Sequence, residues 1–199
     1  LSLLLGIPLG ILSAVKRDTV FDNAAKLFAV IGISAPPFWI AIMLVLLFGG
    51  ILGWLPTFGR GGISHFILPV SVLAWAGMAG YVRLARSAML EVLDSDYVKF
   101  ARVKGLRENS VIWKHALRNA LIPMLTFAGL TLAGLLNGSI AVEVVFAWPG
   151  LGRLMLQGIT SRDFPIIQAT VLAAGFFYIF TSLVVDILYA YVNPRIRFE

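Results

Sequence analysis

The chain contains no cysteine and only two histidines, His65 and His115, among its 199 residues. Without cysteine there is no disulfide framework, thiol nucleophile or thiolate metal site. Two isolated histidines do not suggest a histidine-based metal cluster. Charged residues make up 13% of the chain, whereas a soluble domain carries about 25%. So few charges do not make a water-exposed surface, and we expect lipid to solvate much of the protein.

The chain is rich in apolar residues, with 59% hydrophobic residues and a mean hydropathy of +0.91. Runs near ~20 apolar residues are typical of membrane-spanning helices. The chain has five such runs, at 1–15, 27–52, 66–84, 121–145 and 166–192. The predicted fold is an all-α polytopic membrane bundle, with about five transmembrane helices in one integral membrane domain covering 1–199.

The first run is short for a complete span. Fifteen residues cover about 22 Å as a helix, against a hydrocarbon core of about 30 Å. The run starts at Leu1 without a methionine, and its basic residues, Lys16 and Arg17, follow it. A signal peptide has its basic segment before the apolar stretch. We therefore interpret the run as part of a helix, and we expect the natural protein to continue upstream.

The basic residues separate the two sides of the predicted membrane domain. Five spans put 16–26, 83–118 and 193–199 on one side, with thirteen lysines and arginines against three on the other. The positive-inside rule makes the basic side cytoplasmic, so the C-terminus is predicted to be cytoplasmic. This placement also accounts for the net charge of +6 without a nucleic-acid partner.

Three features within or near the apolar runs are candidates for the pathway of a transported solute. Pro36 and Pro37 interrupt the second run, because proline removes a backbone donor and clashes with the preceding turn. The break is either a gate or an ordinary packing kink with a short entry helix. Asn137 and Glu143 lie in the fourth run, where polar groups often face a cavity. Alternatively, Glu143 reaches the headgroups or pairs with Arg153.

The segment 91–120 carries strong local signals. Asp94 or Ser95 is a suitable N-cap for a short helix, and Asp96 adds negative charge at its positive end. Gly105 stands where a C′ glycine belongs, with Leu106 as its hydrophobic partner. Asn109 or Ser110 is then predicted to cap a second helix. The segment therefore predicts a short helix, a tight turn and a second helix that re-enters the membrane.

The first of these helices has one apolar face, because Tyr97, Phe100, Ala101 and Lys104 recur at i, i+3, i+4 and i+7. Three uses of this face remain open on physical grounds. The face lies on the membrane surface, packs on the protein's own helices, or docks in a groove of another protein.

The sequence of this segment resembles the cytoplasmic signature of ABC-importer permeases, most closely the dipeptide, oligopeptide and nickel branch. The similarity rests on Asp-Tyr-Val-Lys-Phe-Ala-Arg-Val-Lys-Gly-Leu at 96–106 and His-Ala-Leu-Arg-Asn-Ala-Leu-Ile-Pro at 115–123. It extends over nearly the whole chain through shorter motifs, which lie at 6–10, 35–39, 146–153, 163–165 and 193–197. Two departures stand out. Lys99-Phe100-Ala101 replaces the general Glu-Ala-Ala, and the family's first transmembrane helix and external region are absent.

The resemblance implies a permease subunit of a binding-protein-dependent importer in the bacterial or archaeal cytoplasmic membrane. It implies four partners: a second permease subunit, favoured as a paralogue, two ATPase subunits and an extracytoplasmic solute-binding protein. The chain has no Gly-x-x-x-x-Gly-Lys-Ser/Thr loop. ATP and Mg are therefore expected on the partners, with no cofactor on this chain and no enzyme activity of its own. The implied ATPase-coupling residues are Asp96, Tyr97, Phe100, Ala101, Arg102, Lys104, Gly105, Leu106 and Arg107.

The predicted external segment 146–165 has two interpretations. Trp148, Arg153 and Phe164 face the binding protein, or the aromatic rings anchor the segment at the membrane interface. Two other functions were weighed. A secondary transporter or channel fits poorly with so few intramembrane carboxylates. An intramembrane metalloprotease lacks the His-Glu-x-x-His pair. The residues do not distinguish a dipeptide from a longer peptide or a nickel chelate as the solute.

Overall fold

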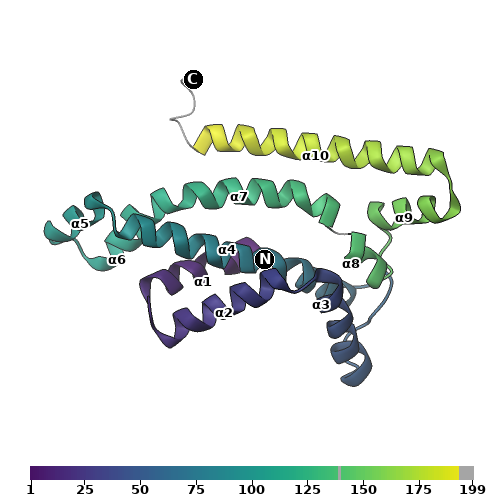
Figure 1. The fold of residues 1–199 in the computed structure, drawn as a ribbon, viewed down its shortest axis with the longest axis horizontal. Helices are drawn as coiled ribbons and strands as arrows, with labels where there is room; N and C mark the ends of the chain where they lie inside the picture. Colours follow the sequence, from purple (N-terminus) through teal and green to yellow (C-terminus); the bar gives the residue numbers. More distant parts are fainter. Residues whose placement is uncertain (139, 193–199) are drawn as a thin grey trace. The chain divides into compact units, whose positions relative to one another are not determined.

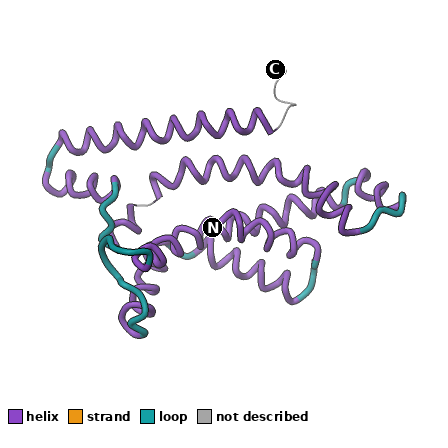
Figure 2. The backbone as a smooth tube through the Cα atoms, turned by 180° about the vertical axis from the view of Figure 1, so that it is seen from behind, coloured by secondary structure: helices purple, strands orange, loops and turns teal. Residues whose placement is uncertain are grey.

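A computed structural model describes residues 1–138 and 140–192, and every regular element in these two ranges is a helix (Figures 1 and 2). This agrees with the predicted all-α class. The described residues form two compact units. The first contains Leu1–Ser34 and Ala76–Ala128, and the second contains Ala35–Trp75 and Gly129–Val192. Helices α4 (Ser64–Leu93) and α7 (Leu117–Gly138) contribute residues to both units.

In the first unit, α1 (Ser2–Val15) and α2 (Val20–Ser34) form a helical hairpin (Figure 1). Helix α1 packs closely on α4 through two glycines spaced four residues apart. A Cβ atom placed on Gly6 would lie 2.7 Å from Tyr81 Cβ, and one on Gly10 would lie 2.6 Å from Ala85 Cβ. Small residues at this spacing let the backbones of membrane helices approach each other. The Gly-Ile-Pro-Leu-Gly motif is thus a helix-packing surface.

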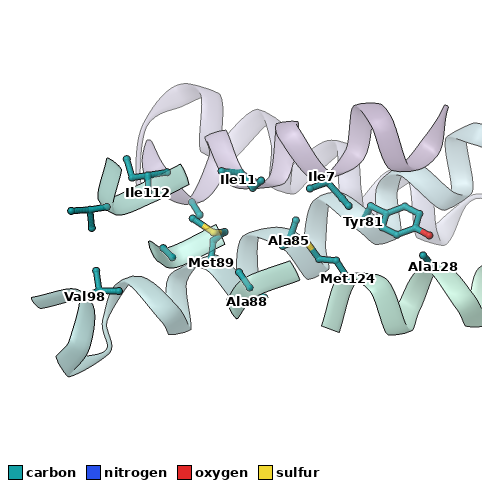
Figure 3. Close-up of a cluster of buried hydrophobic side chains, with 14 of the residues drawn as sticks. Ile7, Ile11, Tyr81, Ala85, Ala88, Met89, Val98, Ile112, Met124 and Ala128 are labelled. Carbon is teal, nitrogen blue, oxygen red and sulfur yellow. The ribbon is translucent and has the colours of Figure 1, made fainter. Parts of the chain in front are cut away.

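The core of the first unit is continuous from α1 and α4 to the segment that follows α4 (Figure 3). Ile7 and Ile11 of α1 meet Ala85 and Met89 of α4. The same cluster includes buried residues of the next elements, namely Val98, Ala101, Val111, Ile112, Ala116, Ala120, Met124 and Ala128. The segment is therefore not a detached loop, because its inner side chains belong to the core of the helices that carry it.

The second unit has its own core, made by α3 (Pro37–Leu44), the first part of α4 and α8 (Ile140–Val145). Buried members include Ala41, Val72 and Phe146. A π-helix, η1 (Val45–Ile51), extends α3. Helix α9 (Leu151–Ser161) then packs on α10 (Phe164–Val192). The predicted external segment is therefore packed against other helices of the second unit.

The predicted apolar runs all fall on helices, but their bounds differ. The second run is broken between Ser34 and Pro37, as Pro36 and Pro37 predict. The described residues of the fourth run lie on α7 and α8, and the third run is extended to Leu93. Among the described residues, two helices are long and apolar enough to cross a membrane, Ser64–Leu93 and Phe164–Val185. A third candidate span arises if Val20–Ser34 and Pro37–Ile51 count as one broken span.

Candidate functional site

The segment after α4 forms the short helix, the turn and the second helix that the local signals predict. Helix α5 (Asp96–Val103) begins after Ser95, which has extended backbone angles at the N-cap position. The Ser95 hydroxyl donates to the Val92 carbonyl instead of capping α5. Asp96 lies in the first turn, where its charge complements the helix dipole. The helix ends at Lys104.

The turn after α5 is a Schellman motif. The Gly105 amide donates to the Arg102 carbonyl at 2.9 Å, and the Leu106 amide donates to the Ala101 carbonyl at 3.4 Å. These are the paired bonds that define this helix ending. Gly105 has a φ of +76°, a conformation that glycine adopts without the penalty other residues incur. The predicted role of Gly105 as a C′ residue is confirmed.

The second helix starts earlier than predicted. Helix α6 (Glu108–Ser110) follows Arg107 at the N-cap, so the prediction that Asn109 or Ser110 caps it is wrong. The reason is the Glu108 carboxylate, which complements the positive helix end and binds Arg102 at 2.7 Å. Helix α6 continues through the π-helix η2 (Val111–Ala116) into α7.

Two side-chain links hold α5 on the elements that follow. The Arg102 guanidinium donates to Glu108 from both Nε and Nη2. The Asn119 amide donates to the Tyr97 hydroxyl at 2.7 Å, which joins α5 to α7. Together with the buried Val98 and Ala101, these links fix the orientation of α5.

The apolar face of α5 is divided between two environments. Val98 and Ala101 are buried in the unit's own core, so Ala101 does not share the exposed environment of Tyr97 and Phe100, with which its spacing groups it. Tyr97 and Phe100 are exposed, and Lys104 Nζ lies 4.6 Å from the Phe100 ring centroid. The physical reason is that α5 packs on η2 through its Val98 side. The outward surface, called here the α5 cap, comprises Tyr97, Phe100, Val103, Lys104, Leu106 and Arg107.

The Arg102–Glu108 pair depends on pH in a defined direction. The hydrogen bond from Arg102 holds the pKa of the Glu108 carboxyl below its usual value. Because the folded pKa is the lower one, the stabilisation is present above the unfolded pKa of about 4.3 and is lost as the pH falls through the folded value. The two side chains are 40% and 56% exposed, so the contribution is below about 1 kcal/mol.

Glu108→Gln is therefore expected to speed amide hydrogen exchange in the turn between α5 and α6 at pH 7. At a pH below the folded pKa of Glu108, the variant and the wild type should exchange equally, because the side chain at position 108 is then neutral in both. Exchange measured on the intact protein in detergent checks this. Equal protection of the two proteins at pH 7 would show that the pair does not hold the turn.

A buried ionic cluster between α1, α2 and α4 was missed by the sequence analysis. Asp22 is fully buried, and its Oδ1 accepts from Ser13 Oγ at 2.5 Å and from Arg86 Nε at 2.6 Å. Its Oδ2 accepts from Arg86 Nη2 at 2.8 Å and from the Asp18 amide at 3.0 Å. Bidentate Arg–carboxylate pairs are among the strong hydrogen bonds of proteins. The available signal was a carboxylate beside an apolar run, where ionisable residues usually have a partner.

The predicted pathway residues are only partly described. The break at Pro36 and Pro37 is present, with Pro37 at the first position of α3. The side chain of Asn137 lies outside the described residues. Glu143 Oε2 accepts from the Arg153 backbone amide at 2.9 Å, near the N-terminus of α9. The Arg153 guanidinium donates to the Ala147 carbonyl, so the predicted pairing with Glu143 occurs through the backbone.

The predicted external residues differ in exposure. The Trp148 ring packs edge-on against Phe66, with ring centroids 4.6 Å apart. Phe164 is 69% exposed and begins α10. Glu143 also lines a cavity of about 510 Å³, whose other walls come from α8, α9 and α10.

The described residues form an all-helical domain in which two helices are long and apolar enough to cross a membrane. A chain of the MetNI methionine ABC transporter, solved in inward-facing conformations, superposes with a TM-score of 0.75. The alignment covers 96% of this chain and 88% of that chain at 20% sequence identity. A likeness at this identity shows the fold alone.

Sequence comparison identifies the family. Residues 6–198 match the family of binding-protein-dependent transport system inner membrane components, and the chain belongs to this family. It is 46% identical to a glutathione transport system permease protein of Salmonella typhi, over all of this chain and 65% of the relative. It is 43% identical to a putative peptide transport system permease protein of Brucella abortus, over 98% of this chain and 64% of the relative.

A third relative is more distant in sequence. The dipeptide transport system permease protein of Alkalihalophilus pseudofirmus is 39% identical, over 99% of this chain and 68% of the relative. The chain thus spans about two thirds of the length of these curated relatives.

Proposed function

We propose that the chain is a permease subunit of an ATP-driven, binding-protein-dependent importer of peptides or a related solute such as glutathione. The observation that carries the proposal is the α5 cap. Its apolar side chains are exposed, while the opposite side of α5 is fixed in the core. A rigid helix with an exposed apolar and basic surface suits docking in a groove of another protein. The relatives' names support peptides as the class of solute.

In this proposal the chain hydrolyses no ATP itself. Two ATPase subunits bind ATP and Mg, and a second permease subunit completes the pathway. The domain is a multi-pass unit of the cytoplasmic membrane, with α5 and the C-terminus on the cytoplasmic side. Residues 91–120 form its coupling loop. The break at Pro36 and Pro37, together with Asn137 and Glu143, is proposed to line or gate the pathway.

The segment 146–165 is proposed to meet the solute-binding protein. Arg153 and Phe164 belong to the packed α9–α10 segment, and Trp148 precedes it. An external position of this segment agrees with the distribution of lysine and arginine, most of which lie in the loops predicted to be cytoplasmic.

The experiment that tests the function is uptake into proteoliposomes that contain the full-length complex. Radiolabelled dipeptide or glutathione should accumulate only with internal ATP and Mg and with the solute-binding protein outside. A complex with ATPase subunits that bind but do not hydrolyse ATP is the control. Uptake that continues with this control would favour a secondary transporter and overturn the proposal.

Docking of the α5 cap is tested separately with single cysteines, because the 199 residues contain none. Val103 is 84% exposed and Ile63 is 85% exposed, so Val103→Cys and Ile63→Cys are matched in accessibility. Only Val103→Cys is expected to crosslink to an ATPase subunit. Capture from Ile63→Cys instead would reverse the proposed topology.

A further inference from the structure

The Asp22 cluster joins parts of the chain that are far apart in sequence. Ser13 belongs to α1, Asp22 to α2 and Arg86 to α4, with 64 positions between Asp22 and Arg86. The Asp22 side chain is fully buried and that of Arg86 is 20% exposed. Lys26 Nζ lies 3.4 Å from Asp22 Oδ2 but is 42% exposed. Arg86 is thus the main partner of the carboxylate.

The Asp22 cluster connects α4, which leads to α5, with α2, which leads to the break at Pro36 and Pro37. Arg86 is in the part of α4 that leads directly into α5. Asp22 is in the first turn of α2, and the far end of the same helix, Ser34, adjoins the break at Pro36. Since the first unit has one continuous core around α1, α4 and α5, a displacement of α5 reaches Arg86 through packed atoms.

We infer that Asp22 is a positioning residue that locks α2 to α4, so that displacement of the coupling loop is passed along α2 to the proline break. The inference rests on the proposed function. The path of this displacement runs through Arg86, Asp22 and the body of α2. It is separate from the continuous helix that leads from α6 through η2 into α7. The geometry suits this role because the bidentate contact between Arg86 and Asp22 fixes both distance and orientation.

The test uses the full-length complex in proteoliposomes and measures solute transported per ATP hydrolysed. Asp22→Asn keeps the shape of the side chain and removes its charge. Arg86→Lys keeps the charge and removes the bidentate contact. Each variant is expected to assemble and to hydrolyse ATP, but with transport per ATP reduced several-fold. A purely structural role would lower the amount of complex and leave this ratio unchanged.

Asp18→Asn is the matched control. Asp18 is four residues from Asp22 and meets it only through its backbone amide, while its own side chain is 76% exposed. Its φ of +62° is also tolerated by asparagine. Transport per ATP should therefore equal that of the wild type in this variant.

If Asp22→Asn complexes do not assemble, Ser13→Ala provides the milder change, because it removes one hydrogen bond and leaves the Arg86 pair. A wild-type transport ratio in both Ser13→Ala and Arg86→Lys would overturn the lock while leaving the proposed function intact. Nucleotide-independent uptake by the wild-type complex would instead overturn the proposed function.

Discussion

Gly105→Val is expected to lower solute-stimulated ATPase activity of the reconstituted complex about tenfold while membrane insertion is unchanged. The φ of Gly105 is +76°, and a residue with a Cβ pays about 1–2 kcal/mol there, which changes an equilibrium about 5–30-fold. A β-branched residue is a clear outlier at positive φ. The Schellman turn should open, and Leu106 should leave the α5 cap.

Gly105→Asn is the control that separates the effect of backbone strain from the effect of side-chain size. A Cβ at this position meets no atom within 4 Å. Neither valine nor asparagine is therefore expected to clash with the rest of the chain at its Cβ. Asparagine enters the left-handed region far more readily than valine, and it should retain most of the ATPase stimulation. The measurement is ATP hydrolysis with and without loaded solute-binding protein, at equal subunit abundance. Full stimulation in the valine variant would count against coupling through this turn.

Gly10→Ala is expected to have the largest effect on stability. Its Cβ would lie 2.6 Å from Ala85 Cβ and 2.6 Å from the Val82 carbonyl oxygen. Because one of these atoms is backbone, α1 must move away from α4. Overpacking of this kind costs about 1–3 kcal/mol, and the shift would also disturb the contact between Ser13 and Asp22.

The matched control is Gly175→Ala in α10, where an added Cβ meets nothing within 4 Å. There the gain in helix propensity should stabilise the chain by about 0.5–1 kcal/mol. Thermal unfolding of the full-length subunit in detergent, followed by size-exclusion chromatography, measures both variants. If both melt alike, the close packing of α1 on α4 is not a source of stability.

The main features of the segment 91–120 could be predicted because its signals are local. An aspartate in the first turn of the helix and a glycine after its end act within a few residues of one another. Ser95 marks the start of the helix without capping it through its side chain. The start of α6 was predicted two or three residues late, because the contact of Glu108 with Arg102 depends on the turn between them. The inward orientation of Ala101 likewise depends on η2, which the spacing of residues along α5 does not contain.

For the long-range contacts, the sequence likewise shows the residues involved, and only the structure shows their partners. The Gly6 and Gly10 spacing belongs to a motif by which the sequence resembles its family, yet only the structure shows α4 as the partner. Arg86 was counted as one of many cytoplasmic cations, although it pairs with Asp22 across 64 positions.

The sequence by itself determined the helical class, the break at Pro36 and Pro37 and the helix–turn–helix at 91–120. Apolar runs, prolines, caps and a C′ glycine act on neighbouring residues and need no other part of the chain. Only the tertiary structure decided which side of α5 is buried, how Glu143 reaches Arg153, and that Asp22 joins α2 to α4. These depend on which helices become neighbours, and a buried carboxylate is stable only where its partners converge.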